Sequence, residues 1–79
     1  MRIFIKNLSG RSTQIFVNGS DTIAQGKLKY KEASKTNNAD PQWKIDGTVM
    51  NNNKTFNDYG IDEDDNITSN DRSQGGKNK

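Results

Sequence analysis

Two residue types that carry much of the chemistry of proteins are missing from this sequence. Its 79 residues include no cysteine and no histidine. The first absence excludes disulfides, thiolate metal sites and thiol nucleophiles, and the second removes the commonest general base and metal ligand. We therefore expect no enzyme activity, no metal site and no cofactor.

Apolar residues are also scarce. Hydrophobic residues make up 28% of the chain, against about 45 to 50% in a typical soluble domain, a figure that also counts glycine. A chain of this length buries only about 60% of the surface that its unfolded form exposes. Partial disorder is one interpretation of this composition, and the regular placement of the few apolar residues argues against it.

Charge gives no strong bias toward a partner. The chain has 12 basic and 10 acidic residues and a formal net charge of +2, too weak a field to steer it to nucleic acid or an anionic membrane. Residues 1–6 contain too short an apolar run for a signal peptide, and no segment approaches membrane-spanning length. We expect a monomer in the cytoplasm, the nucleus or both, which binds neither nucleic acid nor membranes.

The first seventeen residues are the most regularly alternating part of the chain and predict a β-hairpin. Gly10 can close its loop because glycine adopts positive φ freely. The face expected to be buried comprises Met1, Ile3, Ile5, Thr13, Ile15 and Val17. An in-register hairpin then places Phe4 and Phe16 on the outward face. Two interpretations are open: cross-strand stacking with a cation–π contact from Arg2, which we favour, or a partner-binding patch.

A capping box predicts a helix over residues 23–34, because Thr22 is followed three residues later by Gln25. The narrow apolar stripe of this helix comprises Ile23, the stem of Lys27, and Tyr30. Gly26 lies on the same stripe, where glycine costs about 1 kcal/mol relative to alanine. Either Tyr30 leans over the gap or the helix approaches the sheet closely there. Leu28 points elsewhere and is expected at the surface.

The second half of the chain is predicted to complete the core with another hairpin and a short last strand. Pro41 favours extended backbone before it, and Asp46-Gly47 is a strong two-residue hairpin signal. The core residues expected here are Trp43, Ile45, Met50, Tyr59 and Ile61. A turn over residues 55–58 can end at Gly60. The last strand, residues 67–71, has one apolar residue and must be held mainly by backbone pairing.

Residues 62–66 form an acidic run. A solvated turn explains it better than a calcium loop, because the run lacks the ligand spacing and central glycine of such loops. Residues 72–79 contain no packing residue and are expected to be a flexible tail. The predicted organisation is one domain over residues 1–71 followed by this tail, and the element order indicates an α+β roll, with a mixed sheet packed on one helix.

The sequence resembles the ubiquitin family over the whole of this domain. The match runs without a gap from Met1 to Gly76. The positions identical to ubiquitin are Met1, Ile3, Phe4, Lys6, Leu8, Gly10, Val17, Ser20, Asp21, Thr22, Ile23, Lys27, Lys29, Gly47, Thr55, Asp58, Tyr59, Ile61, Arg72, Gly75 and Gly76. The resemblance implies a β-grasp fold whose first and last strands are adjacent and parallel in the centre of the sheet.

The resemblance also implies a function for the tail. In the family, a cysteine protease removes the residues after the second glycine, and activating, conjugating and ligating enzymes pass the freed carboxylate to lysine amines of substrate proteins. Conjugation would thus occur through Gly76 after removal of residues 77–79. Gly75 lacks a Cβ and can enter a narrow slot. Arg72 resembles the family's contact to its activating enzyme.

Other positions depart from the family. Leu8 is retained from the family's apolar recognition patch, but the other two patch positions hold Lys44 and Asn70, which would leave polar groups unpaired in a receptor interface at about 1 to 3 kcal/mol each. The positions of the best-known chain linkages hold Thr48 and Glu63. Two interpretations of Lys6, Lys27 and Lys29 are open: solvated surface lysines, which we favour for each, or candidate acceptor lysines. The tail has Asp71, Ser73 and Gln74 where ubiquitin has leucine, leucine and arginine.

Two functions from different classes are therefore open. The first is a protein modifier attached through Gly76. The second is a binding module that is not conjugated, a decoy or adaptor, whose candidate partner surface comprises Phe4, Phe16 and Leu8. The departures at the patch and in the tail motivate this alternative.

Overall fold

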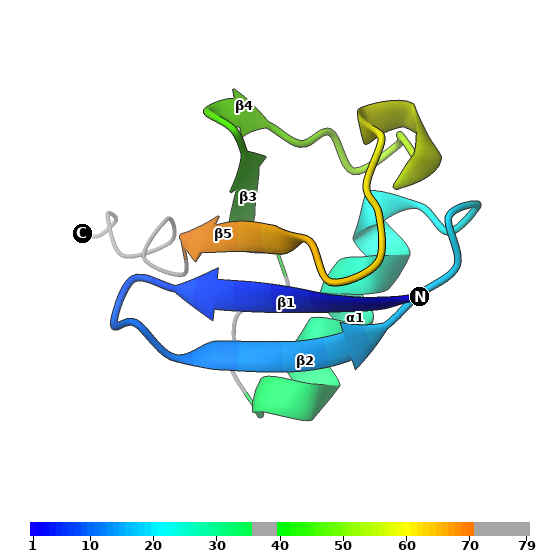
Figure 1. The fold of residues 1–79 in the computed structure, drawn as a ribbon. Coiled ribbons are helices and arrows are strands. Elements are labelled where there is room, and N and C mark those ends of the chain that lie inside the picture. Colours follow the sequence, from blue (N-terminus) through cyan, green and yellow to red (C-terminus); the bar gives the residue numbers. More distant parts are fainter. Residues whose placement is uncertain (36–39, 71–79) are drawn as a thin grey trace.

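The computed structural model describes residues 1–35 and 40–70 of the chain. Its elements are β1 (Arg2–Asn7), β2 (Ser12–Phe16), α1 (Ile23–Ser34), β3 (Gln42–Ile45), β4 (Thr48–Val49), the 3₁₀ helix η1 (Asn57–Tyr59) and β5 (Asn66–Asn70). The strands form one mixed sheet of order β2-β1-β5-β3-β4, and α1 lies across one of its faces (Figure 1). Strand β1 pairs antiparallel with β2 and parallel with β5. The predicted β-grasp roll is confirmed.

The N-terminal hairpin has the predicted register. Ile3 lies opposite Ile15, and Gly10 closes the loop with φ +91°. The side-chain Oδ1 of Asn7 accepts hydrogen bonds from the backbone N–H and the hydroxyl of Ser9 and from the N–H of Arg11. The turn is therefore stabilised by a short polar side chain as well as by the glycine.

The second hairpin also follows its sequence signal. Ile45 pairs with Thr48, and the two residues between them have positive φ, +51° at Asp46 and +82° at Gly47. This is the geometry of a type I′ turn, whose twist matches that of the flanking strands. The Asp46-Gly47 prediction is confirmed.

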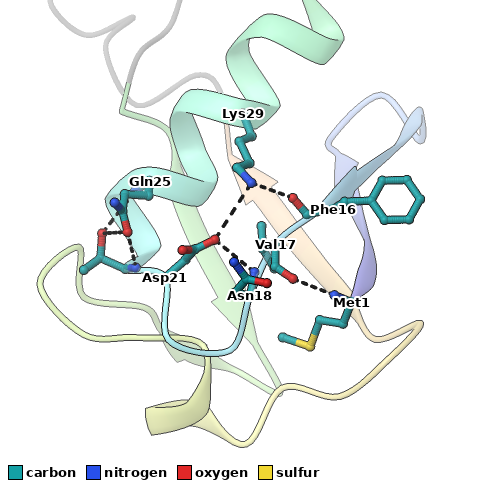
Figure 2. Close-up of polar contacts among 8 residues, drawn as sticks. Met1, Phe16, Val17, Asn18, Asp21, Gln25 and Lys29 are labelled. Carbon is teal, nitrogen blue, oxygen red and sulfur yellow. Dashed lines mark hydrogen bonds and ion pairs between the residues drawn. The ribbon is translucent and has the colours of Figure 1, made fainter.

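The helix begins with the predicted capping box. The N–H of Gln25 donates to Thr22 Oγ1 at 3.2 Å, and the N–H of Thr22 donates to Gln25 Oε1 at 2.8 Å (Figure 2). The helix ends at Lys35, which adopts a left-handed conformation with φ +58°. A Cβ placed on Gly26 would lie 2.4 Å from Phe56 Cζ and 3.3 Å from a ring carbon of Trp43. The glycine therefore leaves room for these two rings, and the space is not filled by Tyr30.

The core lies between α1 and the sheet and includes one large side chain that the sequence analysis did not place there. Its buried residues are Ile3, Ile5, Ile15, Val17, Ile23, Tyr30, Trp43, Met50, Phe56, Ile61 and Ile67. Phe56 is fully buried, whereas Tyr59 and Ile45 are only partly buried. The prediction that Tyr59 points into the interior is therefore met only in part: the ring packs against the core while staying partly exposed, and its hydroxyl accepts a hydrogen bond from the N–H of Asn51 at 2.6 Å.

The last strand and the acidic run are tied to β1. Strand β5 ends at Asn70, the last described residue. Ser69 and Ile67 of this strand are both fully buried. The N–H of Asp64 donates to the carbonyl of Arg2 at 2.7 Å, and the N–H of Arg2 donates to Glu63 Oε2 at 2.9 Å. Within residues 1–35 and 40–70, no group of three acidic side chains is placed to hold a metal ion, and no helix is long and apolar enough to cross a membrane.

Candidate partner surface and attachment lysines

One face of the sheet is covered by α1, and no other helix or strand of the described residues covers the opposite face (Figure 1). Strand side chains alternate between these faces, so the strand register defines the open face. Its members are Ser12, Gln14 and Phe16 of β2, Arg2, Phe4 and Lys6 of β1, Asn66, Thr68 and Asn70 of β5, Gln42 and Lys44 of β3, and Val49 of β4. We call these residues the outer face. It contains two of the three members of the expected partner surface.

Phe4 and Phe16 differ in accessibility. The Arg2 guanidinium lies over the Phe4 ring, 5.7 Å from its centroid, and Phe4 is only partly exposed. Arg2 Nε also donates to Asp64 Oδ1 at 2.7 Å, and this hydrogen bond raises the pKa of the guanidinium and lowers the pKa of the Asp64 carboxyl. The cation–π contact expected from Arg2 is therefore present, and it involves Phe4. Phe16 remains 60% exposed.

The end of β2 is held by contacts around Phe16. Figure 2 shows the Lys29 Nζ donating to the carbonyl of Phe16 at 2.9 Å and lying 3.9 Å from Asp21 Oδ2. The N-terminal ammonium of Met1 donates to the carbonyl of Val17 at 2.6 Å. The Phe16 ring points away from all of these contacts (Figure 2). The backbone of this edge strand is thus fixed while its aromatic side chain stays free.

The three candidate acceptor lysines lie in different environments. Lys6 is exposed and has no polar partner within the described residues. Lys29 makes the contacts described above. Lys27 has only 5% of its side chain exposed, and its Nζ donates to Asp40 Oδ1 at 3.0 Å. Asp40 also accepts from Asn52 Nδ2 at 3.1 Å, and these hydrogen bonds, that from Asn52 first, lower the pKa of its carboxyl. Lys27 can meet a substrate only after this pair opens.

The Ubiquitin family model matches residues 3–72. The chain belongs to the ubiquitin family. A search of curated proteins finds no match. Family membership agrees with the parallel pairing of β1 and β5 and with the capped helix across the sheet.

In this ubiquitin-family domain, the recognition patch differs from the family's as expected from the sequence. Leu8 is 52% exposed in the loop after β1. Lys44 is exposed on the outer face, and Asn70 lies on the same face, two residues along β5 from Thr68, which is opposite Lys44. A cationic side chain and an amide thus occupy two of the three positions of the patch. The polar groups that these two residues would leave unpaired in a receptor interface imply weak binding of ordinary ubiquitin receptors, which stays a prediction.

The expected attachment residues of this family member cannot be placed. Arg72, Gly75 and Gly76 lie outside the described residues, as does Asp71. Arg72 is the last residue of the family match, and the two glycines follow three and four positions later. The division into a domain over residues 1–71 and a tail therefore also stays a prediction.

Two residues of the lysine environment were missed in the sequence. Nothing in the sequence indicates Asp40 or Asn52 as a partner, yet Asp40 accepts from Lys27 and Asn52 donates to Asp40. The position of Lys27 on the apolar stripe of α1 is a signal for a nearby carboxylate, because buried charges are nearly always paired. The sequence spacing between these residues does not identify which carboxylate it is.

Proposed function

We propose that this protein is a ubiquitin-like modifier, conjugated through the carboxylate of Gly76 to lysine amines of target proteins. The observation that supports it best is the family match over residues 3–72 with Gly75 and Gly76 three and four positions beyond its end. A processing cysteine protease hydrolyses the peptide bond after Gly76 and removes the residues that follow, here residues 77–79. The domain itself acts as the attached label and catalyses nothing.

The covalent steps follow from the chemistry of a carboxylate. Attack on a carboxylate by an amine needs an activated acyl group, so an activating enzyme adenylates Gly76 from ATP with release of pyrophosphate. A thiol of the activating enzyme displaces AMP from the adenylate to form a thioester, and the acyl group passes by exchange to a thiol of a conjugating enzyme. With a ligating enzyme, a lysine amine displaces that thiol and forms the isopeptide bond. Glycine at both positions suits enzyme channels too narrow for a Cβ. These partners place the protein in the cytoplasm, the nucleus or both.

A mass measurement tests this proposal. The full chain with an N-terminal tag is incubated with ATP and a lysate of its source cells, and the recovered protein is weighed. We expect a species ending at Gly76 and high-mass adducts that Gly76→Val abolishes. Ser73→Ala is the matched control in the same tail and should leave both products unchanged. Persistence of the residues beyond Gly76, with no adducts sensitive to Gly76→Val, would refute conjugation.

A second candidate function is supported by the exposure of Phe16. A binding module that is never conjugated could use this ring, because an aromatic side chain that is 60% exposed beside a fixed edge strand resembles an interface anchor. Phe16→Ser should then remove partner capture in pull-downs with the fold unchanged, and Phe4→Ser should add a smaller loss. Leu28, which is 57% exposed on α1, supplies the control Leu28→Ser. Equal capture by the Phe16 and Leu28 variants would count against this function.

A further inference from the structure

One row of side chains crosses all five strands on the outer face. Ser12 lies opposite Lys6, Lys6 opposite Thr68, Thr68 opposite Lys44, and Lys44 opposite Val49. Residues directly opposite each other in a sheet point to the same face. All five side chains are exposed. The row therefore forms a continuous accessible line on the molecule.

The two lysines of this row have no counter-charge in the part of the chain that the structure describes. Neither ammonium makes an ion pair within the described residues. The third cation of the outer face, Arg2, is already bound to Asp64 at 2.7 Å. None of the described outer-face residues is acidic. The described carboxylates all lie on other parts of the surface, so this face keeps a local positive potential although the net charge of the chain is only +2.

The spacing of the row defines what can bind it. Lys6 and Lys44 lie on the two strands that flank β5, and strands are about 4.8 Å apart, so their backbones are separated by about 10 Å. The hydroxyl-bearing Thr68 lies between them. Val49, which is 49% exposed, ends the row beyond Lys44 and offers an apolar contact. In an extended peptide, two acidic residues lie about 7 Å apart when they are two positions apart and about 13 Å apart when they are four positions apart. The separation of the Lys6 and Lys44 backbones falls between these two values.

We propose that this row, the Lys6–Thr68–Lys44 row, is a docking site for an extended acidic segment of a partner protein. Two carboxylates of the segment pair with the ammonium groups of Lys6 and Lys44, and an apolar side chain next to them packs on Val49. Charge complementarity favours this occupant over a purely apolar peptide, because an apolar ligand would leave both ammonium groups partly desolvated and unpaired.

A protein segment fits the row better than nucleic acid does. Among the described outer-face residues only two cations are unpaired, and the acidic run over residues 62–66 borders the same sheet through its contacts with Arg2. A phosphate backbone tracks a longer series of cations and would be repelled by that run. A short acidic peptide can pair with both lysines without reaching it.

The test measures peptide binding to the full chain without any conjugating enzyme. Fluorescence anisotropy follows a fluorescein-labelled peptide in which a run of glutamates adjoins a leucine, and the same peptide with glutamines is the ligand control. We expect Lys6→Gln and Lys44→Gln each to weaken binding by up to about fivefold, the range of an exposed ion pair, and added salt to weaken it further. Lys54→Gln removes an exposed lysine outside the outer face and should change nothing.

Mapping of amide chemical shifts gives a second measurement. The glutamate peptide should move the signals of Thr68 and Val49 and leave those of α1 unchanged. Equal affinity of the glutamate and glutamine peptides, or equal loss in the Lys54 and Lys44 variants, would overturn the proposal. So would tighter binding of a single-stranded oligonucleotide through the same lysines. Because no conjugation step is involved, this result is independent of the fate of Gly76.

Discussion

Replacing Gly26 by alanine should destabilise this domain, although helix propensity alone predicts the opposite. Alanine is better than glycine in a helix by about 1 kcal/mol. The added Cβ would, however, meet Phe56 Cζ at 2.4 Å, in a ring that is fully buried against its neighbours. Overpacking of a filled core costs typically about 1 to 3 kcal/mol, and so deep an overlap belongs at the upper end. The net loss should be about 2 kcal/mol.

Urea denaturation followed by the fluorescence of Trp43 measures this loss. Trp43 is the only tryptophan and is fully buried, so its emission reports the global transition. In a domain of this size, about 2 kcal/mol also lowers the melting temperature by about 10 °C. Ala33→Gly, at an exposed position of the same helix, measures the effect of helix propensity alone. It should lower the free energy of unfolding by no more than about 1 kcal/mol.

A double-mutant cycle then tests whether the loss of stability comes from overlap between the added Cβ and the Phe56 ring. Phe56→Leu removes the tip of the ring, so Gly26→Ala should be far less harmful in that background, with a coupling free energy of at least about 1 kcal/mol. If Gly26→Ala instead raises the free energy of unfolding by about 1 kcal/mol, the glycine is not there to make room for the ring and the packing argument is wrong.

Three further predictions concern charged groups. Asp40→Asn should lower the free energy of unfolding, measured in urea, by about 2 kcal/mol; the loss is smaller than for a wholly buried pair because the Asp40 side chain is 69% exposed. Adding Lys27→Met to that variant should restore most of the lost stability. If it restores none, the pairing is contradicted. The hydrogen bond from Arg2 lowers the pKa of the Asp64 carboxyl, so its contribution to stability is complete above the ordinary pKa of an aspartate and is lost as the pH falls through the lowered pKa; the urea midpoint should drop as the pH falls below about 4, less so in Asp64→Asn. Limited acylation with an amine-reactive ester should modify Lys6 well before Lys27 by peptide mass spectrometry, and the reverse order would refute the burial of Lys27.

Local signals made the hairpins and the helix start predictable from the sequence. The alternation around Gly10, the Asp46-Gly47 pair and the Thr22–Gln25 box each act over a few residues, and the structure realises all three. The register of the first hairpin followed from the requirement that one face be apolar throughout. The outward positions of Phe4 and Phe16 could therefore be named in advance.

Contacts between distant turns could not be predicted in this way. Phe56 belongs to an irregular turn with no periodicity, so nothing in its surroundings indicated that it fills the space above Gly26. The pairing of Lys27 with Asp40 likewise depends on how a loop returns to the helix. The cross-sheet row of Lys6, Thr68 and Lys44 needed the order of the strands, because these residues come from three separate segments of the chain.

The position of β5 in the sheet has a consequence for how the protein is made. The β1–β2 and β3–β4 hairpins join one sheet only through β5, which is synthesised last of the five strands. Such a high contact order slows folding, and a nascent chain on the ribosome cannot close its sheet before about residue 70 has left the exit tunnel. Fragments that stop before Asn66 should therefore remain unable to fold, however complete their hairpins and helix.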